Sequence, residues 1–141
     1  MNSNNENTIS KDTGTQWTAN WRSQNPNTVN AFLIPAVDFV EVLNEIGVLD
    51  DAAAQQAQAN ANNLNSQIRG YLAIDASNME KIIFVGTENV DGVYRDIIDG
   101  TIDGTTPTTL KSSASDPSTS GVFDFTSPCP PSCDPNSPLN Q

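Results

Sequence analysis

Three short runs of apolar residues in the middle of the chain constrain its fold most. They cover residues 68–75, 81–89 and 93–99, and the first two are rich in β-branched and aromatic residues, which favour strands. The polar stretch ASNME separates the first two runs, and an Asp-Gly pair separates the second from the third. Both separators are typical of tight turns. The pattern predicts a meander of three antiparallel strands.

A helix is predicted before this meander, over residues 10–22. Ser10 suits the N-cap position, and Trp17 and Trp21 lie four residues apart on one face of the helix. Tryptophans are enriched at binding hot spots, but they are also the largest apolar residues available to a core. We favour the core. Residues 28–35 follow as a strand-like run.

A second helix is predicted to begin at Pro35 and to end at Gly47, which suits a C-terminal cap. The apolar spacing predicts a wide buried face, made of Val37, Phe39, Val40, Val42, Leu43 and Ile46. The opposite stripe is acidic and contains Asp38, Glu41 and Glu45. Paired carboxylates can act as acid and base when they are buried, but a stripe opposite the apolar face indicates a solvated surface.

A third helix, over residues 51–62, is predicted to be mostly exposed because it is rich in Ala, Gln and Asn. A last strand is predicted at 121–126. The expected fold class is α+β, with two or three helices packed on one face of a small, mainly antiparallel sheet. One domain at 9–126 lies between a flexible arm, residues 1–8, and a Pro- and Cys-rich tail, residues 127–141.

The charge of the chain limits its partners. It has 17 acidic and 6 basic residues, a formal net charge of −11, and the basic residues are scattered. Phosphate binding needs clustered Lys and Arg, so nucleic acid and anionic membranes are not expected as partners. A protein is expected instead, either a basic partner or a second copy in a homo-oligomer.

The chain contains no histidine. Catalysis by a Ser-His-Asp or Cys-His arrangement and zinc sites that use histidine are therefore excluded. No cofactor-binding motif is present, and we expect no enzymatic activity and no cofactor. The first residues lack the basic and apolar regions of a signal peptide, and no apolar run approaches a membrane span. We therefore expect synthesis in the cytoplasm.

One group of acidic residues has the composition of a calcium site. Calcium prefers several carboxylate and carbonyl oxygens that converge in a flexible loop. Glycines are interspersed among the candidate ligands, which are Glu88, Asp91, Asp96, Asp99 and Asp103. Their spacing does not match the EF-hand loop, and Asp-Gly pairs are common in ordinary turns. We favour turns and keep calcium as an alternative.

Both cysteines, Cys129 and Cys133, lie in the tail. Three residues separate them, among them Pro130 and Pro131, so the segment is neither a CxxC redox motif nor a helix. A disulfide across this short loop is sterically possible. The tail is either a stiff clip that contacts the body or a neighbour, or a loose terminus with reduced thiols. Phe123 and Phe125 alternate just before it and are candidates to anchor it.

Three segments carry a resemblance: WTANWRSQNPNTVNAFLIP, IRGYLAID and VFDFTSPCPPSCDPNSPLN. With them, the chain resembles a group of small uncharacterised Bacteroidota-type bacterial proteins with a DFT-x-PCP-x-x-CD-x-x-SPLN tail. The resemblance implies a compact α+β unit with an integral tail. It implies no activity, so it assigns no catalytic residue.

The sequence therefore predicts a non-enzymatic structural, assembly or protein-interaction module. Two alternatives stay open. One is a small acidic protein of the immunity or inhibitor type that binds a basic partner through electrostatic attraction. The other is a calcium-dependent protein that uses the acidic residues between 88 and 103.

Overall fold

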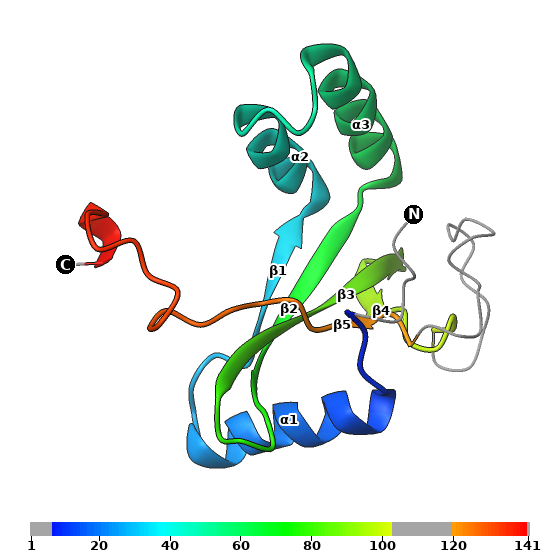
Figure 1. Ribbon diagram of the computed structural model, residues 1–141. Coiled ribbons are helices and arrows are strands. Elements are labelled where there is room, and N and C mark those ends of the chain that lie inside the picture. The colour runs from blue at the N-terminus through cyan, green and yellow to red at the C-terminus, as the bar shows by residue number, and fades with distance from the viewer. Residues whose placement is uncertain (1–6, 103–119, 141) are drawn as a thin grey trace.

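The computed structural model describes residues 7–102 and 120–140, and Figure 1 shows the arrangement of the elements. The helices are α1 (Lys11–Gln24), α2 (Ala36–Glu45) and α3 (Asp51–Leu64), with a short 3-10 turn, η1 (Pro138–Asn140), in the tail. The strands are β1 (Ala31–Pro35), β2 (Gln67–Ile74), β3 (Glu80–Val90), β4 (Val93–Asp96) and β5 (Val122–Phe123). The predicted α+β class is confirmed.

The strands form one antiparallel sheet in the order β1–β2–β3–β4, and β5 also pairs with β3. The predicted meander is thus present. Its second turn has Asp91 and Gly92 at positive φ, 52° and 84°, as a two-residue hairpin turn requires. The first turn is held by the Asp75 carboxylate, which accepts hydrogen bonds from the backbone N–H groups of Ser77 and Met79.

The helix ends follow the local sequence. The Ser10 hydroxyl caps α1 by accepting a hydrogen bond from the Thr13 N–H at 3.1 Å, and the Asp50 carboxylate caps α3 through the Ala53 N–H at 2.8 Å. Pro35 is the N-cap residue of α2, and Gly47, at φ 80°, follows its C-terminal end. As predicted, α3 is mostly exposed, with Ala54 as its buried residue.

The helices do not share one face of the sheet. In Figure 1, α1 lies beneath the sheet, while α2 and α3 lie together at the opposite end of β1 and β2. The buried core lies under α1 and contains Ala73, Ile83, Val85 and Val122, against which Trp17 packs. The close approach of α1 depends on Gly14, where a Cβ would lie 3.2 Å from Cγ1 of Val122.

The prediction of a wide buried face on α2 holds only in part, because Val37, Phe39 and Val40 are half-buried. No residue of α2 is fully buried, and Val42, Leu43 and Ile46 are exposed. The reason is topological, because α2 follows β1 without a loop and therefore lies past the end of the sheet. Its main packing partner, α3, offers mostly Ala, Gln and Asn side chains, which bury little apolar area.

The two chain ends meet at β5. Asp124 N–H donates to the Asn7 carbonyl at 2.7 Å, Ile9 N–H donates to the Val122 carbonyl at 3.0 Å, and Thr8 forms a bridge with Phe123. The described end of the predicted arm, residues 7 and 8, therefore belongs to the domain.

Candidate functional site: the phenylalanine face

The sheet has two faces because successive residues of a strand point to opposite sides. On β2 and β3, Tyr71, Ala73, Ile83 and Val85 point toward α1. We call this side the α1 face. The alternate residues of these strands, among them Ile82 and Phe84, point away from α1.

The strand register aligns one residue from each of four strands in a row. Phe32 of β1 is paired with Gly70 of β2, Gly70 with Phe84 of β3, and Phe84 with Phe123 of β5. The row lies on the side opposite α1. Gly70 makes it possible, since a Cβ there would lie 3.2 Å from Cε1 of Phe84 and 3.3 Å from Cγ2 of Ile82.

Two more phenylalanines join the row at its centre. The ring of Phe39, from α2, meets the Phe84 ring edge-on, with centroids 6.1 Å apart. The ring of Phe125 stacks on the Phe84 ring at 5.2 Å. The chain has five phenylalanines, so all of them gather here. We call this surface the phenylalanine face; it consists of Phe32, Phe39, Ile82, Phe84, Phe123 and Phe125.

Much of this face is open to solvent. The exposed fraction is 56% for Phe32, 58% for Phe125, 39% for Ile82 and 36% for Phe123. Contiguous exposed apolar surface of this kind is typical of interaction sites, whereas single exposed apolar residues are not informative. Aromatic side chains are also enriched at the centres of protein interfaces.

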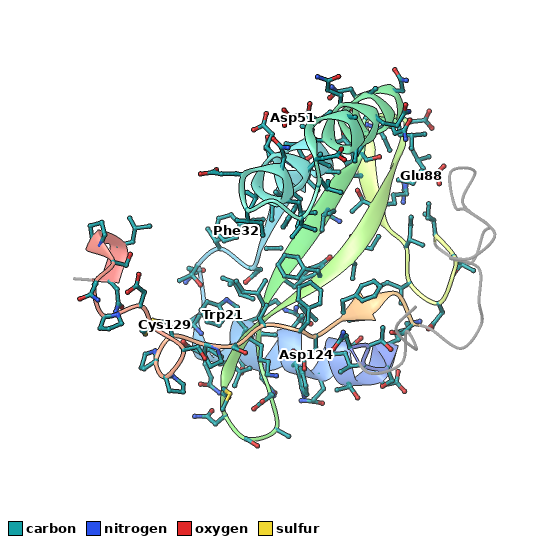
Figure 2. All side chains as sticks on the ribbon, turned by 45° about the horizontal axis from the view of Figure 1, so that its top comes forward. Trp21, Phe32, Asp51, Glu88, Asp124 and Cys129 are labelled. Atoms are coloured by element: carbon teal, nitrogen blue, oxygen red, sulfur yellow. A yellow bond between two sulfur atoms is a disulfide. The ribbon has the colours of Figure 1, made fainter. Side chains whose placement is uncertain are left out.

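The apolar surface continues onto α2. Phe39, Leu43 and Ile46 are spaced four and three residues apart and so lie on one side of the helix. Val42, at the neighbouring position, is exposed as well. In Figure 2, Phe32 lies beside α2, whereas Asp124 lies beside α1. The strands and α2 thus contribute to one extended apolar surface.

This surface adjoins a strongly acidic part of the molecule. Residues 36–64, which form α2, α3 and their connection, contain five acidic residues and no Lys or Arg. The predicted acidic stripe of α2 is exposed at each of its three positions, Asp38, Glu41 and Glu45. The phenylalanine face is therefore flanked by negative charge on its α2 side.

The α1 face has a different chemistry. Asp96 of β4 forms an ion pair with the Arg69 guanidinium and accepts a hydrogen bond from the Tyr71 hydroxyl. Arg69 also donates to the Tyr94 carbonyl at 2.9 Å. Burial, together with the Asp96 carboxylate, raises the pKa of Tyr71 to about 12. The hydroxyl therefore stays protonated as a hydrogen-bond donor.

The second ion pair of the described residues also lies on the α1 face. The Lys81 ammonium contacts both Asp124 carboxylate oxygens at 3.0 and 3.1 Å, and it lies 5.7 Å from the centre of the Trp17 ring. Arg69 and Lys81 thus direct the positive charges of β2 and β3 toward α1. These two central strands therefore contribute no positively charged side chain to the phenylalanine face.

The tail and the residues just before it lie in two environments. Phe123 and Phe125 belong to the phenylalanine face, and the Thr126 hydroxyl bonds the backbone N–H and carbonyl of Ile82 at 3.2 and 3.1 Å. Cys129 and Cys133 form a disulfide that encloses Pro130 and Pro131. The hydrogen bonds between described residues that involve residues 128–140 stay within the tail, which ends beyond β1 in Figure 1.

The proposed calcium ligands do not converge in the described part of the chain. Asp96 forms an ion pair with Arg69, Glu88 lies opposite Arg95 in the register of β3 and β4, and Asp91 and Asp99 occupy turns with positive φ. Asp103 lies outside the described residues. Across 7–102 and 120–140, no three acidic or cysteine side chains are grouped as metal ligands.

Sequence reasoning found only the C-terminal part of the phenylalanine face. It singled out Phe123 and Phe125 but missed Phe32, Phe84 and Gly70 as members of one row. One available signal was the glycine inside a strand-like run, because such a glycine often marks the close approach of a neighbouring group. The register that aligns the four strands could not be read from the separate runs.

Within residues 7–102 and 120–140, no helix has the length and apolar character that a bilayer span requires. The chain was also compared with protein-family models, with curated proteins and with solved structures, and none of them matches it.

Proposed function

We propose that this protein is a non-enzymatic protein-interaction module whose phenylalanine face binds a basic, amphipathic segment of a partner protein. The observation that carries the proposal is the clustering of all five phenylalanines on one side of the sheet, with Phe32, Phe123 and Phe125 exposed. Clustered aromatic side chains provide a large apolar contact area with little loss of side-chain entropy on binding.

Charge supports the choice of partner. The formal net charge is −11, and every charged residue between 36 and 64 is acidic. Both features disfavour close approach of a second copy through the same surface. The same charges attract a segment that presents leucines or aromatics on one side and Lys or Arg beside them. The apolar contacts would supply most of the affinity, and the charges would speed association and select the partner.

A pair of synthetic peptides tests this proposal. One is an amphipathic helix of leucine and lysine, and the other carries glutamate in place of each lysine. We expect fluorescence anisotropy to detect binding of the lysine peptide, weakened by added salt, and no binding of the glutamate peptide. The double variant Phe32→Ala/Phe123→Ala should lower the affinity by roughly tenfold or more.

The control variant is Leu139→Ala, which removes a side chain that is 95% exposed in the tail. It should bind as the unmodified protein does. Equal binding of both peptides, or full affinity in the double variant, would contradict the proposal. Light scattering provides a separate check: a dimer that Phe32→Ala dissociates would assign the face to self-assembly instead.

A further inference from the structure

Most of the positive charge of this acidic protein is concentrated around two adjoining cavities on the α1 face. A cavity of about 210 Å³ lies between α1 and the sheet, and one of about 440 Å³ lies beside it. Both are lined by Lys11, Asp96 and Ile98. The structure describes five Lys and Arg residues, and all except Lys81 line these cavities. We call the two cavities together the basic pocket; its cationic residues are Lys11, Arg22, Arg69 and Arg95.

One side of α1 places two of these charges at opposite ends of the smaller cavity. Lys11, Thr15, Thr18 and Arg22 are spaced four, three and four residues apart, so they lie along one side of the helix. At about 1.5 Å per residue, the backbone positions of Lys11 and Arg22 are roughly 16 Å apart. Lys11 is also the first residue of a 14-residue helix, where backbone N–H groups add positive potential.

The inner wall of the smaller cavity is apolar. It is formed by the buried side chains of Ile83, Val85 and Val122, which belong to the core. A cavity with an apolar wall and cationic ends suits a ligand with an apolar body and an anionic group, because apolar contact provides affinity and a few charged groups fix orientation.

Among the described residues that line the pocket, acidic residues are fewer than cationic ones. The acidic residues are Asp96 and Asp99, against four cationic residues. Arg69 already pairs with Asp96, which also holds the Tyr71 hydroxyl. The two ion pairs formed between described residues involve neither Lys11 nor Arg22. These two side chains are therefore placed to receive an external anion.

We propose that the basic pocket binds a small organic anion with an apolar body, of the class of aromatic or short aliphatic carboxylates. The carboxylate pairs with Lys11 or Arg22, and the apolar body packs on Val85 and Val122. This site lies on the opposite side of the sheet from the phenylalanine face and is independent of the partner proposed for that face.

Three probes test the ligand class: benzoate, its uncharged analogue benzamide, and inorganic phosphate. We expect benzoate to shift the backbone amide NMR signals of Gly14, Thr15 and Val122 in a saturable manner. Benzamide should not do so, because it lacks the charge, and phosphate should not, because it lacks the apolar body. Absence of saturable shifts with benzoate would overturn the proposal, as would equal binding of benzamide or phosphate.

Two variants locate the site. The double variant Lys11→Gln/Arg22→Gln should weaken benzoate binding by roughly tenfold or more, because charge-assisted contacts are lost. Gln55→Glu, on the exposed side of α3, is the control for each single variant, Lys11→Gln and Arg22→Gln, since each of these changes makes the chain more negative by one charge. Its affinity for benzoate should equal that of the unmodified protein. If Gln55→Glu weakened benzoate binding as much as Lys11→Gln or Arg22→Gln does, net charge alone would explain the loss of affinity. That result would overturn the proposed site.

Discussion

The two faces of the sheet are built from alternate residues of the same strands, yet their surroundings differ. Ile83 and Val85, which point toward α1, are each 2% exposed, whereas Ile82, between Lys81 and Ile83, is 39% exposed. The α1 face is covered by a helix and contains both ion pairs of the described residues. The phenylalanine face carries larger apolar side chains, and of the described segments only α2 and the residues that follow β5 place a ring against Phe84.

The difference shows that apolar content alone does not identify a core. The smaller aliphatic residues became buried because a helix could approach them closely at Gly14. The bulkier aromatic residues stayed partly exposed because α2 and α3 lie at one end of the strands rather than across them. Four experiments test this difference between the two faces.

The largest expected effect comes from neighbouring residues of β3 on opposite faces. Ile83→Ala should lower the free energy of unfolding by about 2–5 kcal/mol, because it leaves a cavity in the core. Ile82→Ala should lower it by about 1 kcal/mol or less, since that side chain is already exposed. Urea unfolding followed by circular dichroism measures both. Equal losses would show that the phenylalanine face is as important to stability as the α1 face.

A smaller effect is expected from the polar centre of the α1 face. Asp96→Asn removes the carboxylate that forms an ion pair with Arg69 and accepts a hydrogen bond from the Tyr71 hydroxyl. The free energy of unfolding should therefore fall by about 1–3 kcal/mol. Asp99→Asn is the matched control, because Asp99 is exposed and Asn also tolerates its positive φ of 53°. A loss no larger than that of the control would mean that the pair is not stabilising.

The hydrogen bond between Tyr71 and Asp96 also predicts that the protein becomes less stable at alkaline pH. The pKa of Tyr71 is about 12 in the folded protein against an ordinary value of 10.0, so folding favours the protonated phenol. The associated stability is complete below pH 10.0 and is lost as the pH rises toward about 12. The Tyr71→Phe variant should lack the loss of stability that arises from ionisation of this phenol. Phenolate absorbance in a Tyr94→Phe background, where Tyr71 is the only tyrosine, measures the pKa; a value near 10.0 would contradict the prediction.

The smallest effect is expected from the end of the tail. A chain that ends after Ser127 keeps the Phe125 stack and the Thr126 hydrogen bonds but loses the disulfide loop. Because residues 128–140 are mostly exposed, the free energy of unfolding should change by about 0.5 kcal/mol or less. Thermal unfolding of the full and shortened chains compares them. A loss above about 1 kcal/mol would indicate that the tail holds the body together.

Local sequence signals predicted much of the fold. The Asp91-Gly92 turn, the Ser10 cap and the polar composition of α3 each depend on neighbours along the chain, and each is present in the structure. The sequence predicts the last strand at 121–126, but the strand is limited to Val122–Phe123. After it, the chain contacts Ile82 through the Thr126 side chain instead of through a continuing backbone ladder.

The candidate site was predicted only in part, because its members are far apart in the sequence. Phe32 and Phe123 are brought into one row by three successive strand pairings, and no short segment contains that information. The basic pocket was missed for the same reason. Lys11 and Arg22 are isolated charges in the sequence, and they join Arg69 only when α1 packs on the sheet.

The element types, the turns, the acidic character and the lack of histidine follow from residue identity and short-range geometry. The side of the sheet that α1 covers, and the side that stays open, follow instead from tertiary packing. That choice depends on strand register and on the close contact of Gly14 with Val122, which are interactions between residues remote in the chain. The separation of an aromatic face from a basic pocket is therefore a property of the packing, not of any one segment.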